Sequence, residues 1–147
     1  MSVYVEIVRG ALKPARLAVG KGTGAFVVFE GVVRAEEAGK KIRSLDYQVY
    51  EPMASKQLQL LAEAMQKEFG VLDVSVWHSK GKVGVGKVSF RLVVESAHRA
   101  EALEATGEFI DRMKRDVPIW KKPVFAEARS RTPAPSKKKK SKRKAKR

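Results

Sequence analysis

With 147 residues, the chain is long enough to form one domain that buries a sizeable core. It contains no cysteine and only two histidines, which excludes disulfides, thiolate metal sites, a cysteine nucleophile and a histidine-rich metal centre. The formal net charge is +15, but residues 136–147 carry nine lysines and arginines and no acid, so the rest of the chain, at +6, is only moderately basic. No apolar run approaches the roughly 20 residues that span a bilayer, and the N-terminus lacks a signal-peptide pattern, so we expect a soluble cytoplasmic protein without a membrane partner.

The first part of the chain predicts strands joined by loops. Residues 3–8 alternate weakly between apolar and polar side chains, and residues 11–24, with a proline and a glycine cluster, predict a loop. Residues 25–34 are apolar on both faces, which is typical of a central strand. A charged turn at residues 36–41 leads to residues 42–50, whose alternation predicts a half-buried strand paired with the previous one in a hairpin.

A helix is predicted over residues 53–69, followed by two further strands. Pro52 stands where a helix can begin, Gly70 is a natural C-terminal stop, and one stripe of the helix is apolar. The stripe consists of Leu58, Leu61, Ala62, Met65 and Phe69. Residues 71–78 and 88–94 then predict strands.

The stretch from Ser96 to Lys122 predicts a long amphipathic helix with a proline-led exit. Ser96 is a good N-cap candidate, and Pro118 ends the helix at or before Val117. Apolar side chains recur at helical spacing and predict a buried stripe of Leu103, Thr106, Ile110 and Met113. A last short strand is expected at residues 124–128.

This order of strands, helix, strands and helix, with hairpins in place of regular β-α alternation, predicts an α+β domain. We expect a mostly antiparallel sheet with two main helices packed on it. The domain is predicted to span residues 1–130, and residues 131–147 are expected to form a disordered Lys/Arg-rich tail. Such a tail can contact polyanions nonspecifically, or it can serve only to solubilise or localise the protein.

Two motifs resemble catalytic signatures, but their context favours ordinary structural roles. Residues 81–87 match the spacing GxxxxGK of a phosphate-binding loop, yet Val88 follows and a strand continues, so the segment at residues 80–87 predicts a glycine-rich β-turn. His78 lies at a predicted strand end and reads as a satisfied polar residue. No serine stands beside a plausible base, so a hydrolase triad has no support.

Several cations lie next to ordered apolar segments. They are Arg34, His98, Arg99, Lys114, Lys121 and Lys122. If they surround one cleft, they would bind a phosphorylated or otherwise anionic substrate, and a lysine among them can act as acid, base or nucleophile near neutral pH. The alternative is an ordinary solvated helix with scattered positive charges.

Four segments together resemble a known family. They are G-A-F-V-V-F-E-G-V-V-R (24–34), D-Y-Q-V-Y-E-P-M-A (46–54), A-H-R (97–99) and M-K-R-D-V-P-I-W-K-K (113–122), and they are similar to the large, catalytic subunit of molybdopterin synthase. The resemblance implies an α/β-hammerhead fold. It also implies a sulfurtransferase that converts cyclic pyranopterin monophosphate to molybdopterin, the organic part of the molybdenum cofactor. The sulfur would come from the C-terminal Gly-Gly thiocarboxylate of a small ubiquitin-like subunit, in a heterotetramer built on a homodimer of large subunits.

The resemblance also implies roles for individual residues. Lys114 and Lys121 would be catalytic, and the remaining residues would bind or shape the pocket for a phosphorylated pterin substrate. These pocket residues would be Phe29, Val32, Val33, Arg34, His98, Arg99 and Lys122. No metal or organic cofactor is implied. The chain departs from the family pattern at Pro123, where glutamate is usual, and at Ser79, where arginine is usual.

Helix geometry adds a constraint on this site. In an unbroken helix, His98 and Lys114 would lie about 24 Å apart, which is too far for one pterin to touch both. Either Gly107 breaks the helix, or its two ends serve different sites. We favour the second, in which His98 and Arg99 of one subunit complete the pocket of its twin.

The sequence also leaves open an alternative function to sulfur transfer. The chain would then be a divergent non-catalytic paralogue that binds nucleic acid through the basic tail.

Overall fold

The computed structural model describes residues 1–126, which form one sheet system and two helices. The elements, in chain order, are β1 (Ser2–Arg9), β2 (Ala25–Val32), β3 (Glu36–Glu37), β4 (Lys40–Val49), α1 (Met53–Phe69), β5 (Asp73–Gly84), β6 (Val88–Ser96), α2 (Arg99–Asp116) and β7 (Ile119–Phe125). The expected disordered tail and the proposed domain boundary at residue 130 lie outside the described residues.

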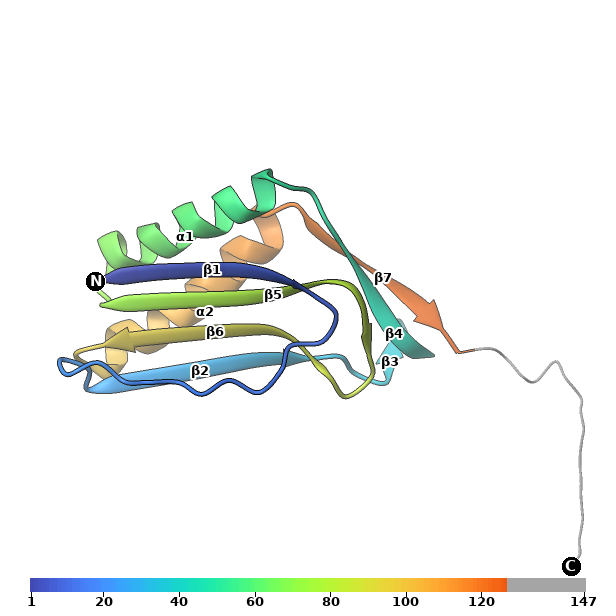
Figure 1. Ribbon diagram of the computed structural model, residues 1–147, viewed down its shortest axis with the longest axis horizontal. Helices are drawn as coiled ribbons and strands as arrows, with labels where there is room; N and C mark the ends of the chain where they lie inside the picture. The colour runs from blue at the N-terminus through green and yellow to red at the C-terminus, as the bar shows by residue number, and fades with distance from the viewer. Residues whose placement is uncertain (127–147) are drawn as a thin grey trace, which may run out of the picture.

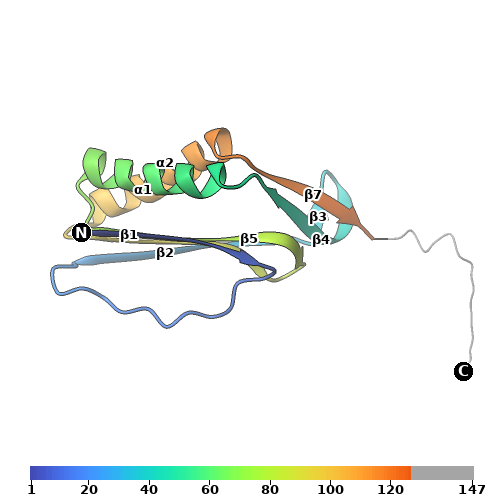
Figure 2. The ribbon, with the colours of Figure 1, turned by 45° about the horizontal axis from the view of Figure 1, so that its top comes forward.

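Both helices lie side by side over one face of the sheet, as Figures 1 and 2 show. The core between these two layers is apolar and joins buried residues of α1, α2, β5 and β6. The loop between β1 and β2 runs on the opposite side of the sheet (Figure 2). Most strand pairs are antiparallel, and β1 with β5 is the parallel pair. The predicted α+β architecture is therefore confirmed.

Strand β5 connects the main sheet to a second pair of strands, β4 and β7. Its first part lies between β1 and β6, and its last part, Gly81–Gly84, pairs instead with β4. Gly81 has φ of +79°, a conformation that favours glycine and allows a change of direction there. The predicted glycine-rich turn at residues 80–87 is therefore wrong in extent, because strand pairing continues to Gly84 and the turn occupies residues 85–87.

Two predictions about strand positions are wrong. Residues 25–32 form β2, which is an edge strand that pairs with β6, and they are not central. Strand β4 does not form a hairpin with β2, since it pairs with β3, β5 and β7. Part of the apolar character of β2 has another cause: Phe29, on the same face as Val27, and Val32 line a cavity.

The prediction for α1 is confirmed at both ends. The helix begins directly after Pro52 and ends at Gly70, which has the left-handed φ of +74° and donates its N–H to the carbonyl oxygen of Gln66. The apolar stripe faces the sheet, with Leu58 and Met65 fully buried. Local signals therefore suffice to define this element.

The second helix, α2, exists as predicted, but its start and its buried face differ. Ser96 belongs to β6, and His98 is the N-cap, with its N–H donated to the Glu101 carboxylate at 3.2 Å. Leu103 is 58% exposed, so its assignment to the buried stripe is wrong. The face that meets the sheet consists of Ala102, Ala105, Thr106, Phe109 and Met113. The alanines allow α2 to approach the sheet closely, and Leu103 is rotated away from this face.

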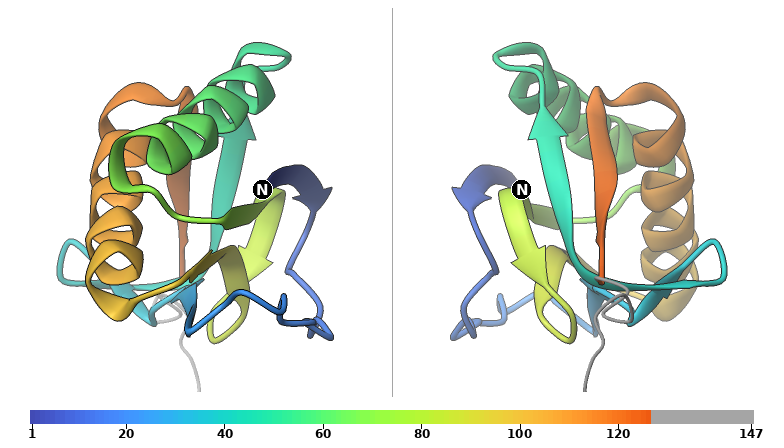
Figure 3. Two further views of the ribbon diagram at one scale, coloured as in Figure 1. Left: turned by 90° about the vertical axis from the view of Figure 1, so that its left-hand side faces the viewer. Right: turned by 90° about the vertical axis from the view of Figure 1, so that its right-hand side faces the viewer.

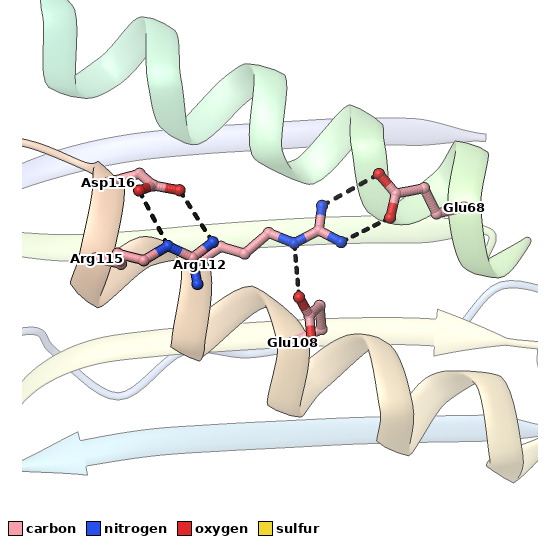
Figure 4. Close-up of polar contacts among 5 residues, drawn as sticks. All are labelled: Glu68, Glu108, Arg112, Arg115 and Asp116. Atoms are coloured by element: carbon pink, nitrogen blue, oxygen red, sulfur yellow. Dashed lines mark hydrogen bonds and ion pairs between the residues drawn. The ribbon is translucent and has the colours of Figure 1, made fainter.

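The two helices are also joined by an arginine. Arg112 of α2 donates to both carboxylate oxygens of Glu68 on α1, at 2.7 and 3.1 Å, and to Glu108 one turn earlier at 2.7 Å (Figure 4). The hydrogen bond with Arg112 lowers the pKa of Glu68 below its usual value.

The α2 helix continues without a break through Gly107 to Asp116. This excludes the possibility that Gly107 breaks the helix between His98 and Lys114.

Strand β7 begins earlier than predicted. It covers Ile119–Phe125, whereas the sequence predicted only residues 124–128 and an irregular exit before them. It pairs antiparallel with β4, and the two strands lie side by side in both views of Figure 3. Both strands project beyond the ends of the helices, as Figure 1 shows. Trp120, Lys121 and Lys122 therefore lie on a strand, where successive side chains point to opposite faces.

Candidate functional site

A cavity of about 660 Å³ lies where the C-terminal end of α2 meets β2, β6 and the β4–β7 pair. It is lined by Phe29, Gly31, Val32, Arg34, Glu37, Leu45, Tyr47, His78, Ser89, Phe90, Ile110, Met113, Lys114, Ile119, Trp120 and Lys121. A cavity of this size, with an apolar wall and a few charged groups, is typical of a site for a small organic molecule.

Aromatic rings form one wall of the cavity. The ring of Phe90 lies 6.0 Å from Phe29 and 5.7 Å from His78, and His78 meets the ring of Tyr47 edge-on at 5.2 Å. The Tyr47 hydroxyl is hydrogen-bonded to the Ser89 hydroxyl at 2.9 Å, which orients the phenol. Such a wall can pack against a flat heterocyclic ring.

His78 is a buried imidazole within this wall. It is 5% exposed, and its Nδ1 lies 2.8 Å from the carbonyl oxygen of Ser79. A carbonyl oxygen only accepts, so Nδ1 is the ring nitrogen that donates in this contact. Burial lowers the pKa of His78, and the bond to Ser79 opposes this only partly. His78 is a satisfied polar residue, as the sequence predicts. Its position in the cavity wall was not predicted.

Three cations line the cavity. Lys114 comes from the last turn of α2, Lys121 from β7, and Arg34 from the segment after β2. Arg34 is far from the two lysines in the sequence, and the fold brings all three to one cavity. Cations gathered at an aromatic cavity can hold a phosphate and stabilise a developing oxyanion.

An acid lies among these cations. The Glu37 carboxylate accepts a hydrogen bond from Lys121 Nζ at 3.3 Å, and the same oxygen lies 3.7 Å from Arg34. Glu37 is not among the site residues predicted from the sequence. Its only sequence signal was a position in a charged turn, which does not indicate what the side chain meets.

The remaining predicted site residues lie elsewhere in this subunit. Val33 is buried in a second apolar cluster with Ile42, Leu45 and Val83. Lys122 is exposed on β7 and does not line the cavity. His98 and Arg99 are exposed at the start of α2, about 24 Å from the end that carries Lys114.

Two kinds of site find no support in residues 1–126. Within this range, no group of three or more His, Asp or Glu side chains is arranged to hold a metal ion. Neither α1 nor α2 is long and apolar enough to cross a membrane. The cavity is therefore the candidate site of the described part of the chain.

Comparison with known proteins places this chain in a family. The family model described as MoaE protein matches residues 8–116. The chain belongs to the MoaE family. A molybdopterin synthase catalytic subunit from Pyrococcus abyssi is 36% identical over 111 residues, which cover 76% of this chain and 75% of that protein. The corresponding subunit from Thermoplasma volcanium is 37% identical, with 84% and 93% covered. The predicted family and its enzyme class in molybdenum cofactor biosynthesis are thereby confirmed.

The family includes longer members and proteins of known structure. The bovine catalytic subunit is 38% identical, and the match covers 79% of this chain but 61% of that protein. The crystal structure of molybdopterin synthase from Staphylococcus aureus matches with a TM-score of 0.71 and 30% identity over 82% of this chain and 92% of that chain. A complex of subunits 1 and 2 of the molybdopterin-converting factor from Helicobacter pylori matches with a TM-score of 0.65 and 30% identity, over 85% and 91%. The MoaE fold is therefore shown by both sequence and structure.

Proposed function

We propose that this chain is the subunit that inserts sulfur into cyclic pyranopterin monophosphate to form molybdopterin. The observation that carries the proposal is the single cavity that collects Lys114 and Lys121 beside an aromatic wall. The wall suits the flat pterin ring, and the cations suit its phosphate. Membership of the MoaE family makes this reaction the first to test.

We assign distinct roles to the groups around the cavity. Lys114 lies next to the incoming thiocarboxylate and moves protons during sulfur transfer, with Lys121 assisting. Arg34 and the lysines stabilise the oxyanion that forms when the thiocarboxylate carbonyl is attacked. Phe29 shapes the wall, and Val32 contributes to its edge. No step in this scheme requires a metal or an organic cofactor.

The sulfur donor in this proposal is a small ubiquitin-like subunit with a C-terminal Gly-Gly thiocarboxylate. The Helicobacter pylori relative was solved as a complex of two subunits, which supports a protein partner for this chain. An extended Gly-Gly end is narrow enough to enter a cavity of about 660 Å³ alongside part of a pterin. Its terminal carboxyl carbon must reach the region of Lys114.

A homodimer of this chain would complete the site. His98 and Arg99 lie at the opposite end of an unbroken α2 from Lys114, so in one subunit they cannot contact the ligand held near Lys114. Exposed cations beside a helix N-terminus are suited to an anion. We therefore place His98 and Arg99 of one subunit at the cavity of the other, where they bind the phosphate or the pterin.

Reconstitution tests this function directly. The full chain is combined with a thiocarboxylated small subunit and the cyclic pterin precursor, and molybdopterin is measured. Lys114→Ala should lower the rate by roughly 10²-fold or more, because a positioned acid–base group contributes about that much. Lys67→Ala is the matched control, since Lys67 is an exposed lysine in the last turn of the other helix. Equal rates in the two variants, with both folded, would refute the assignment.

A further inference from the structure

Glu37 lies among the cations that line the cavity, although the cavity otherwise suits an anion. It belongs to β3, which turns back into β4 through Ala38 and Gly39, both with positive φ, at 52° and 78°. Its side chain is 19% exposed, compared with 52% for Lys121 and 78% for Arg34. The carboxylate is therefore the least exposed charge of the three.

One oxygen of Glu37 faces both cations. Its distances are 3.3 Å to Lys121 Nζ and 3.7 Å to Arg34. The hairpin does not depend on these contacts, because the β3–β4 backbone pairing already joins Glu37 to Lys40. The side chain instead links the hairpin to β7 at the cavity.

The strength of these contacts determines what they can do. Ion pairs between partly exposed side chains are weak and salt-sensitive, so a competing anion can replace them. An anionic group that enters the cavity meets Arg34 and Lys121, which the Glu37 carboxylate already contacts. It must either displace that carboxylate or bind beside a like charge.

We propose that Glu37 is an internal counter-ion that competes with anionic ligands for Arg34 and Lys121. It holds the two cations together in the empty cavity and weakens the binding of any anion that cannot displace it. The inference deepens the proposed function by assigning a control of anion entry to the same site. It rests on that function only for the identity of the natural ligand, so a test with a simple anion separates the two.

The test measures binding of inorganic phosphate to the full chain at low ionic strength. Amide NMR shifts of Lys121 and its neighbours on β7 report the cavity and not the basic tail. Glu37→Gln removes the charge with little change of shape and should tighten binding about five-fold, as expected for one charge at a distance near 4 Å in water. Glu36→Gln is the matched control, because it makes the same change at the adjacent exposed position and should stay within about two-fold of the parent.

A second variant separates charge from contact geometry. Glu37→Asp keeps the charge and shortens the side chain, so phosphate binding should stay close to that of the parent protein. Unchanged or weaker binding in Glu37→Gln would overturn the inference, and so would an equal gain in Glu37→Asp or in Glu36→Gln. None of these measurements requires sulfur transfer, so a failure here leaves the proposed reaction to its own test.

Discussion

Replacing Gly24 with alanine would force apart the start of β2 and the segment that leads into α2. A Cβ at this position would lie 2.3 Å from the carbonyl oxygen of Ala97 and 3.3 Å from its carbonyl carbon. Contacts below 3.0 Å are essentially never seen for real Cβ atoms, and the obstacle is backbone. The Gly24 N–H also donates to the carbonyl oxygen of Ser96 at 2.9 Å, so any shift strains this bond too.

The expected cost can be compared with the same substitution elsewhere. Overpacking that moves backbone costs about 1–3 kcal/mol, and the added loss of a hydrogen bond puts Gly24→Ala near the upper end. Gly107→Ala meets nothing within 4 Å and lies inside α2, where alanine is favoured over glycine by about 1 kcal/mol. The free energy of unfolding should therefore be lower than that of the parent in Gly24→Ala and higher in Gly107→Ala. The difference between the two variants should be about 3–4 kcal/mol.

Urea unfolding followed by circular dichroism measures this gap. Gly24→Ala should lower the midpoint and Gly107→Ala should raise it, while the dependence of the unfolding free energy on urea stays the same in both. A Gly24→Ala protein as stable as the parent would refute the close approach of β2 to Ala97. A destabilised Gly107→Ala protein would contradict an unbroken α2.

Two further predictions concern His78 and the subunit assembly. Because burial lowers the pKa of His78 below the ordinary histidine value of about 6.5, the unfolded chain binds the proton more readily, and the unfolding free energy should fall as the pH drops below about 6.5. His78→Gln should remove this loss between pH 7.5 and 5.5 in urea titrations, whereas an unchanged slope would show that other groups cause it. If His98 acts across a dimer, mixing and refolding Lys114→Ala with His98→Ala should restore about a quarter of the parent activity, since half the dimers are mixed and each has one intact site. Activity that stays at the level of the single variants would place His98 in the same site as its own Lys114.

The helices show how far local signals reach. Pro52 and Gly70 bound α1 because the conformations that they favour, the start of a helix and a left-handed cap, are properties of single residues. Apolar residues at helical spacing predict that α2 exists, but the face of α2 that is buried depends on the sheet on which it packs. Ala102 and Ala105 pack there and Leu103 does not, which a single helix cannot specify.

The cavity could be anticipated only in part. Its lysines and Arg34 are predicted from the cations that lie beside apolar segments, and the resemblance to a family implies their roles; the structure brings Arg34, Lys114 and Lys121 to one cavity. His78 and Glu37 were not placed there, since neither lies in a segment whose pattern indicates which neighbours it will meet.

The α+β class, the first helix and the family follow from the order of the amino acids, because each depends on residues that are close together or on motifs that can be read in order. Three features are visible only in the folded chain: β2 is an edge strand, β4 pairs with β7, and Glu37 contacts Lys121. Strand pairing joins residues that are tens of positions apart, and its register decides which side chains share a face. That long-range register is the physical reason why the cavity, and the acid within it, become visible only in the folded chain.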